Sequence, residues 1–182
     1  KAREIANHRD CILFGLDADE IFSANYTNTN DWKEILMSNP GAVFWFKWAE
    51  LSPNKKNYGD SVYYPWMFHD DGKEPHSNYV RNMHSMRIPY PIQNQQLHYV
   101  NDFRILHLAY LNMSRVASKC RFYTYVDYQM NHRSVISLSR NYRYQKKLEE
   151  YPKDKKYLNY GKQINVLNEV DTTSKKFWFD EY

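Results

Sequence analysis

One short apolar run that ends in acidic residues constrains this chain more than any other feature. The run Cys11–Leu16 (CILFGL) is followed at once by Asp17, Asp19 and Glu20. Its length and flanks favour a buried strand of the kind found inside an α/β sheet. We therefore expect a central strand whose carboxylates are exposed at its C-terminal end, where open α/β sheets bind their ligands.

The chemistry of these carboxylates has two interpretations. Carboxylates so close together repel one another unless a cation lies among them, and Mg²⁺ and Mn²⁺ prefer oxygen ligands. Such an ion can bridge to a diphosphate and neutralise the charge that develops as the phosphate leaves. The same D-x-D pattern also occurs in an acidic turn in which Asp19 or Glu20 begins a helix, and the pattern alone leaves both open.

Hydrophobic periodicity predicts the remaining elements. A helix ends near Asn7, and Asn30–Met37 is a second helix capped by Asn30 or Asp31. Strands are expected at Ala42–Leu51, at Val62–Phe68 and at Val100–His107, and helices from Asn112 and over Ser134–Glu150. Pro65 makes Val62–Phe68 an edge strand or an irregular one. Strands therefore come early and helices late, which predicts an α/β fold with a helical C-terminal part.

The size and cysteine content of the chain narrow its class. Its 182 residues are enough for a substantial core, and two cysteines are too few for a disulfide scaffold. No apolar stretch approaches the about 20 residues of a membrane span, and no signal peptide is recognisable. These features favour a cytoplasmic protein.

The basic residues are concentrated in the last third of the chain. Residues 133–182 contain 11 Lys and Arg against 7 Asp and Glu, which accounts for the whole formal net charge of +4. This segment could contact anionic lipid headgroups at a membrane surface, or it could be a solvated helix face. Nucleic acid is a less favoured partner, because no nucleic-acid-binding motif accompanies the charge.

The aromatic content is high, at 17%, and 17 residues are Tyr. Aromatic side chains offer flat apolar surfaces on which sugar rings can stack, and Tyr and Trp add a hydrogen-bonding group. A Tyr-rich core is the alternative explanation.

The string ILFGLDADEIF, residues 12–22, resembles the central motif of family 2 glycosyltransferases. Weaker similarities extend this resemblance over about Lys1–Tyr142. They comprise Arg3 and Ala6, Trp66-Met67-Phe68 with Asp71-Gly72-Lys73, Met83-His84, and Phe103–Leu108 followed by Arg115, Lys119 and Tyr123.

The resemblance implies a fold, a reaction and a metal site. The fold would be a GT-A-like, Rossmann-like mixed sheet over residues 1–132, followed by a basic helical extension over 133–182. The reaction would transfer a sugar from a nucleotide-sugar donor to a glycan, lipid-linked or protein acceptor. Asp19 would be the direct ligand of Mn²⁺ or Mg²⁺, Asp17 would lie near the ribose or the metal, and His107 would complete the site. His107 could instead be a histidine of the core.

The chain departs from this family in two respects. Ser85 stands where the family commonly has the Glu after a His, so the base that deprotonates the acceptor is unassigned. The weak candidates are Asp70, Asp71, Glu74 and Asp102. The family's nucleotide-binding half, which normally precedes the metal motif, would have to lie upstream or on another chain. Both departures favour the alternative of a non-catalytic carbohydrate-binding or structural module derived from such an enzyme.

Overall fold

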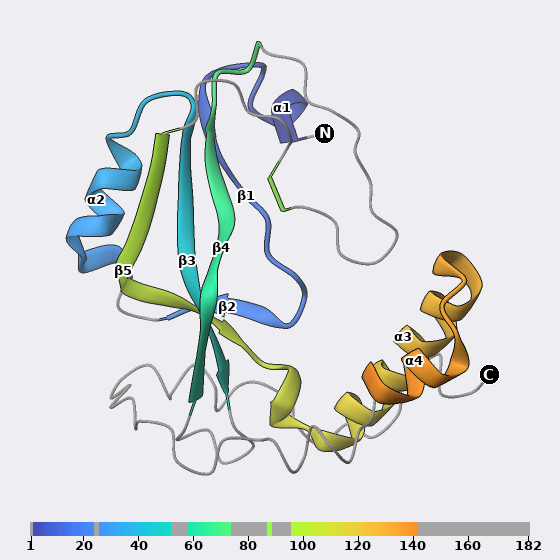
Figure 1. Cartoon of the computed structure of the whole chain (residues 1–182). Helices are drawn as coiled ribbons and strands as arrows, with labels where there is room; N and C mark the ends of the chain where they lie inside the picture. The colour runs from blue at the N-terminus through green and yellow to red at the C-terminus, as the bar shows by residue number, and fades with distance from the viewer. Residues whose placement is uncertain (1, 24–25, 52–57, 74–86, 89–95, 142–182) are drawn as a thin grey trace. The chain divides into compact units, whose positions relative to one another are not determined.

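A computed structural model describes residues 2–23, 26–51, 58–73, 87–88 and 96–141 (Figure 1). Its internal contacts divide the chain into two units. The first, here called the sheet unit, comprises Lys1–Ala49, Asp60–Arg81 and Ser85–His107. The second, the helical unit, comprises Glu50–Gly59, Asn82–His84 and Leu108–Tyr182. Because the chain contains both a sheet and helices, its fold is of the mixed α/β kind, as the sequence predicts.

The sheet unit is built on a curled mixed sheet of five strands in the order β1-β4-β3-β5-β2 (Figure 1). The strands are β1 (Cys11–Phe14), β2 (Glu20–Phe22), β3 (Ala42–Leu51), β4 (Tyr58–Asp70) and β5 (Gln96–His107). β1 pairs antiparallel with β4, and β2 pairs antiparallel with β5. A short helix, α1 (Ala2–Ile5), precedes the sheet. The strands expected at residues 42–51 and 100–107 are confirmed.

The prediction of a central buried strand at Cys11–Leu16 is wrong. The strand ends at Phe14, lies at the edge of the sheet and is half-buried along its length. Its side chains point alternately to the two faces of the sheet. Ile12 and Phe14 pack against one hydrophobic cluster, and Leu13 packs against another. An edge strand with an apolar contact on each face has the same continuous apolar sequence as a central one.

Of the two alternatives for Val62–Phe68, an edge strand or an irregular one, the first is wrong for the strand as a whole. It lies within β4, between β1 and β3. The pairing of β4 with β1 covers only the end of β4, up to the bond from Gly15 N–H to the Trp66 carbonyl.

Helix α2 (Asn30–Leu36) is tied to β5 by two aspartates. Asp102 Oδ2 accepts hydrogen bonds from the N–H groups of Asn30 and Asp31, at 3.1 and 3.3 Å. In return, Asp31 Oδ2 accepts from the N–H groups of Asn101 and Asp102, at 2.6 and 2.7 Å. The N-cap is Thr29, whose hydroxyl accepts from Trp32 N–H, and not Asn30 or Asp31 as the sequence suggested.

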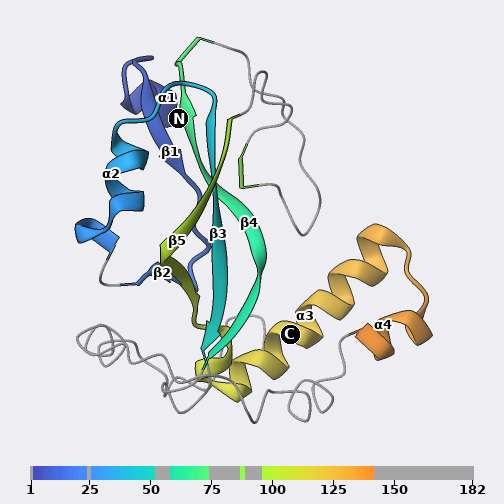
Figure 2. The same cartoon turned by 60° about the vertical axis from the view of Figure 1, so that its left-hand side comes forward.

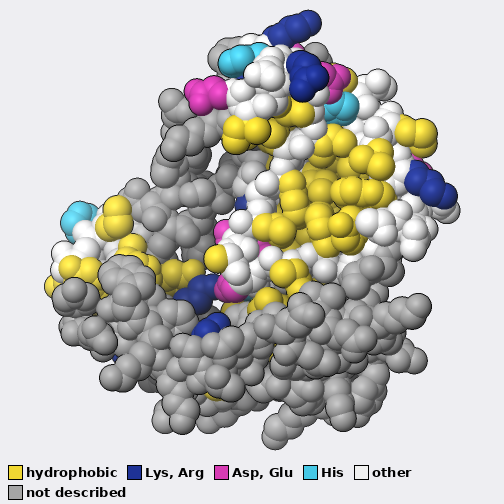
Figure 3. All heavy atoms as spheres, turned by 180° about the vertical axis from the view of Figure 1, so that it is seen from behind, with side chains coloured by type: hydrophobic (Ala, Val, Ile, Leu, Met, Phe, Trp, Pro, Cys, Tyr) yellow, Lys and Arg dark blue, Asp and Glu magenta, His cyan; other side chains and the backbone are white. Residues whose placement is uncertain are grey.

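The main hydrophobic core lies where α2 covers part of one face of the sheet (Figure 2). Its buried members are Ile35, Ala42, Phe44, Phe46, Trp66, Met67, Val100, Phe103 and Ile105. Half-buried residues extend this core toward solvent, namely Ile12, Phe14, Phe22, Tyr26, Trp32 and Trp48. Figure 3 shows hydrophobic side chains gathered on one face of the sheet. The aromatic members of this cluster are Phe and Trp, with Tyr26 as its one Tyr, so among the described residues this core is not the Tyr-rich core that the composition suggests.

The helical unit contains the 3-10 turn η2 (Ala109–Leu111), α3 (Met113–Asn131) and α4 (Val135–Asn141). Asn112 caps α3 by accepting hydrogen bonds from the N–H groups of Ser114 and Arg115. The helix predicted from Asn112 is confirmed, and α4 confirms the start of the one predicted over Ser134–Glu150. Residues 142–150 lie outside the described part of the chain. Among the described residues, no helix is long and apolar enough to cross a membrane.

Candidate functional site

The acidic loop after β1 closes on itself through a pair of hydrogen bonds between Asp17 and Glu20. Asp17 N–H donates to Glu20 Oε2 at 2.9 Å, and Glu20 N–H donates to the Asp17 carbonyl at 3.0 Å. Gly15 enters this loop under the backbone of Arg87, where an added Cβ would lie 3.0 Å from the Arg87 carbonyl oxygen. The loop is therefore a compact turn with a fixed shape.

Glu20 is buried, contrary to the prediction that all the acidic residues of this loop are exposed. Its carboxylate accepts from Trp66 Nε1–H at 3.1 Å and from Arg87, with Nη1 2.8 Å from Oε2 and Nη2 2.9 Å from Oε1. With the bond from Asp17 N–H, these contacts satisfy the carboxylate within the protein. Glu20 is thus a structural carboxylate.

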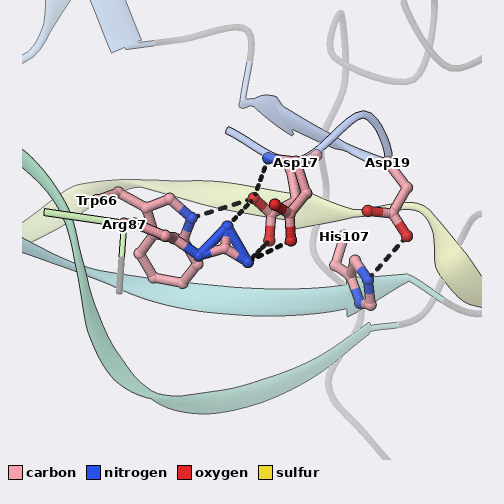
Figure 4. Close-up of polar contacts among 6 residues, drawn as sticks. Asp17, Asp19, Trp66, Arg87 and His107 are labelled. Carbon is pink, nitrogen blue, oxygen red and sulfur yellow. Dashed lines mark hydrogen bonds and ion pairs between the residues drawn. The ribbon is translucent and has the colours of Figure 1, made fainter. Parts of the chain in front are cut away.

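Arg87 supplies the positive charge that the acidic loop requires (Figure 4). Its Nη2 also lies 2.6 Å from Asp17 Oδ2, so one guanidinium bridges two carboxylates, and it stacks 5.1 Å above the Trp66 ring. We call Asp17, Glu20, Trp66 and Arg87 the Arg87 cluster. Sequence reasoning missed Arg87, because no motif marks it and it lies 67 residues from Glu20.

Asp19 points away from the Arg87 cluster and toward His107 (Figure 4). Its Oδ2 lies 3.2 Å from His107 Nε2. The register of the sheet places them there, because Glu20 at the start of β2 pairs with His107 at the end of β5. The His107 ring also packs against Trp48, with ring centroids 4.2 Å apart. Of the three residues expected at the metal site, the structure brings Asp19 and His107 together, while Asp17 contacts Arg87 instead.

Asp19 and His107 could supply two ligands to a small divalent cation, and no group of three or more His, Cys, Asp and Glu side chains in the described residues is arranged to hold one. Ligand atoms about 2.1 Å from one ion and at right angles to each other are about 3 Å apart, close to the observed 3.2 Å. Mg²⁺ commonly takes one or two carboxylates and fills its remaining positions with water and substrate phosphate oxygens. A neutral imidazole suits Mn²⁺ as a further ligand.

The candidate catalytic bases are engaged in structural contacts where the structure describes them. Asp70 is buried and forms a two-point ion pair with Arg3, with distances of 2.6 and 2.5 Å. Asp71 accepts from Lys73 N–H at 2.8 Å, and Asp102 binds the N-terminus of α2. Glu74 lies outside the described residues, as do His84 and Ser85. The structure therefore singles out no base.

A second polar cluster lies at the start of β1. His69 Nε2 contacts Asp10 Oδ1, and its Nδ1 lies 2.9 Å from Ser38 Oγ. The Ser38 hydroxyl donates to the Ile35 carbonyl at 2.7 Å. We call Asp10, Ser38 and His69, with the neighbouring Arg3–Asp70 ion pair, the His69 cluster. Beside it, burial and the carboxylates of Asp70 and Asp10 raise the pKa of the Cys11 thiol.

No protein-family model, curated protein or solved structure matches this chain.

Proposed function

We propose that this chain carries the metal-binding and acceptor side of a GT-A-like, family 2-like glycosyltransferase. In this proposal Asp19 and His107 hold Mn²⁺ or Mg²⁺, and the sugar-nucleotide diphosphate binds against that ion. The acceptor is a glycan, a lipid-linked glycan or a protein. The proposal is the best account of an acidic loop that has one carboxylate directed at a histidine from a distant strand.

The observation that carries the proposal is the 3.2 Å approach of Asp19 Oδ2 to His107 Nε2. The two residues are 88 positions apart in the sequence, and the resemblance to family 2 glycosyltransferases singles out both of them. A partly exposed carboxylate beside an imidazole is a suitable ligand pair for a hard or borderline cation. Because these two residues lie side by side in the fold, a metal site is favoured over a chance occurrence of the D-x-D pattern.

The Arg87 cluster has a supporting part in this proposal. By fixing Asp17 and Glu20, Arg87 and Trp66 hold the turn that directs Asp19 toward His107. A bound divalent ion would neutralise the negative charge that develops on the leaving diphosphate. The protein's own contribution is to position two ligands on a rigid turn and on the end of a strand, so that they need little rearrangement on binding.

Mn²⁺ binding to the full chain tests the proposal. In a protein labelled with ¹³C and ¹⁵N, sub-stoichiometric Mn²⁺ should broaden the side-chain NMR signals of Asp19 and His107 first. Asp19→Ala should weaken Mn²⁺ binding at least about tenfold. Loss of a residue that only hydrogen-bonds to a metal ligand already weakens metal binding by about that much, and loss of the ligand itself should not weaken it less. Asp19→Asn should weaken Mn²⁺ binding nearly as much. His107→Ala should weaken it less, since water can replace a neutral ligand. Together with the nucleotide-binding half, the chain should bind UDP and GDP more tightly when Mn²⁺ is present.

Asp71→Asn is the matched control, because the side chains of Asp71 and Asp19 are both 32% exposed. Asp71 follows the last residue of β4, Asp70, which pairs with the start of β1 and not with the acidic loop after β1. This variant should therefore leave Mn²⁺ binding unchanged. If Asp19→Ala and Asp71→Asn bind Mn²⁺ equally well, the metal-site assignment is wrong. It is also wrong if, with the nucleotide-binding half present, a chelator leaves the binding of UDP and GDP unaltered.

A non-catalytic carbohydrate-binding module is the second candidate. The specific observation in its favour is that Asp70, Asp71 and Asp102 are each used in structural contacts. A module of this kind would bind a saccharide and show no Mn²⁺-dependent binding of UDP or GDP.

A further inference from the structure

The two helices of the helical unit leave a group of large apolar side chains in solvent. Helix α4 turns back beside the end of α3 (Figure 1), and we call this pair of helices the α3–α4 hairpin. Of the side chains described in the hairpin, five large apolar ones are at least half exposed, namely Tyr125, Tyr128, Met130, Val135 and Ile136. Exposed apolar surface that is concentrated in one short stretch is typical of a binding surface.

On α3 the exposed aromatic side chains share a face with a basic residue. Arg121, Tyr125 and Tyr128 follow one another at spacings of four and three, and all three are exposed. Cys120 and Asp127, which are seven residues apart, are buried on another side of the helix. The outward face of α3 therefore combines aromatic rings with a positive charge.

Helix α4 has the same combination on its outward side. Ile136 and Arg140 are four residues apart and both are exposed, and Val135 beside them is exposed as well. Leu138 is buried and holds the helix in place from the other side. Both helices thus present apolar and basic side chains together to solvent.

The hairpin is strongly basic, and its one acidic residue is neutralised within it. Residues 113–141 contain five Lys and Arg and one acidic residue, Asp127, which gives a net charge of +4 (5 − 1). The Asp127 carboxylate accepts hydrogen bonds from Asn131 Nδ2 at 2.6 Å and from Arg133 Nη1 at 3.1 Å. The surface of the hairpin therefore carries an excess of positive charge.

This combination selects among the partners that an exposed apolar face could have. A second copy of the hairpin would bring +4 against +4, and like charges oppose that contact. A nucleic acid would match the charge but leave the aliphatic side chains of Val135 and Ile136 in water. The interface of an anionic bilayer accepts both kinds of group, and Tyr is enriched at such interfaces.

We propose that the α3–α4 hairpin binds the surface of an anionic lipid membrane. Its exposed apolar side chains enter the headgroup region, and its basic side chains lie beside the lipid phosphates. The contact is peripheral and does not depend on the metal site, so the inference goes beyond the proposed function and stands apart from it.

Co-sedimentation of the full chain with vesicles measures this contact. Vesicles of phosphatidylcholine mixed with phosphatidylserine should bind the protein at low salt, and vesicles of phosphatidylcholine alone should bind it much less. Added salt should weaken the binding by screening the charges. Arg140→Gln should weaken binding to the mixed vesicles about fivefold, the effect expected for one basic residue at an anionic surface. Arg140→Lys keeps the charge and should restore the binding.

Ile136→Ser tests the apolar part of the contact and should weaken binding to the mixed vesicles about tenfold, because one aliphatic side chain no longer enters the interface. Leu36→Ser is the matched control. Leu36 and Ile136 are 59% and 68% exposed, and each lies on a helix of 7 residues. Helix α2 has two acidic residues and one basic residue, so it has no attraction to an anionic surface, and Leu36→Ser should bind as the wild type does.

Three results would overturn the proposal. The first is equal binding to vesicles with and without phosphatidylserine, or no binding to either. The second is binding to the mixed vesicles that Ile136→Ser and Leu36→Ser change to the same extent. The third is an absence of vesicle binding together with salt-sensitive binding to poly(U) RNA, or with dimerisation that Ile136→Ser abolishes, which would assign the hairpin to a nucleic acid or to a second copy. None of these results bears on Mn²⁺ binding at Asp19, which decides the proposed function separately.

Discussion

The two ends of β1 carry polar clusters made of the same parts. At its start, Asp70 is buried in a two-point ion pair with Arg3, and buried His69 contacts the more exposed Asp10. After its end, Glu20 is buried in a two-point ion pair with Arg87, and buried His107 faces the more exposed Asp19. Carboxylates, a histidine and an arginine are therefore not enough to mark a functional site in this protein.

The clusters differ in what surrounds the histidine. Both ring nitrogens of His69 contact side chains of the protein, and the hydroxyl of Ser38 links it onward to the backbone of α2. His107 instead stacks on Trp48, in a row of rings that includes exposed Tyr64. The first arrangement ties three segments together. The second borders a surface that a ligand can reach, which is why we place the function there.

The largest expected effect is on stability, and it tests how similar the two buried carboxylates are. Glu20→Ala and Asp70→Ala should each lower the free energy of unfolding by about 3–5 kcal/mol, because each leaves a guanidinium without its buried partner. Asp17→Ala should cost about 1 kcal/mol or less, since the Asp17 side chain is 62% exposed. Urea denaturation measures all three, and a Glu20→Ala protein as stable as Asp17→Ala would show that Glu20 is not the structural carboxylate described above.

A smaller effect separates the structural cluster from the candidate site. Ser38→Ala removes the hydroxyl that contacts His69 and the Ile35 carbonyl, and should lower the free energy of unfolding by about 1 kcal/mol. Mn²⁺ binding should not change. Ser38→Thr keeps a hydroxyl and is the control for stability. Weaker Mn²⁺ binding in Ser38→Ala would break the distinction between the two ends of β1.

The smallest expected effect concerns the thiol of Cys11. Burial and the negative charges of Asp70 and Asp10 raise its pKa, so less thiolate is present at a given pH than in a free cysteine. Alkylation by iodoacetamide near pH ~8 should be slow and should speed up as the pH rises. Asp10→Asn removes one negative charge, lowers the pKa and should raise the rate by less than about threefold.

Mass spectrometry of the alkylated protein measures that rate, in a Cys120→Ser background so that the modified thiol is Cys11. Arg3 acts in the opposite direction on this thiol by lowering its pKa. Arg3→Gln should therefore slow alkylation if it leaves the fold intact. Equal rates in wild type, Asp10→Asn and Arg3→Gln would mean that the cluster has no electrostatic effect on Cys11.

Local patterns in the sequence predict most elements but not the order of the strands. The range of β3 and the start of α3 follow from apolar spacing, which acts over a few residues. The position of β1 at an edge depends on its pairing with β4, where Cys11 lies opposite Asp70. No local pattern contains that information, so an apolar run was assigned to the centre of the sheet.

The candidate site was predictable in part for a similar reason. The acidic string and the resemblance of its motif pointed to Asp19 and His107, and their role as ligands remains a prediction. The burial of Glu20 could not be read from the sequence, since an acidic residue in an acidic loop is normally exposed. It depends on Trp66 and Arg87, which reach Glu20 from other parts of the chain.

The reciprocal bonds between α2 and β5 have a consequence for the order of folding. A helix of 7 residues is too short to be stable alone, and the N–H groups of Asn30 and Asp31 are capped by an aspartate 71 or more positions away. Thr29 provides a local cap for Trp32 only. These two N–H groups are therefore capped only after β5 has joined the sheet, so a chain still emerging from the ribosome lacks this cap until residue 102 has been made.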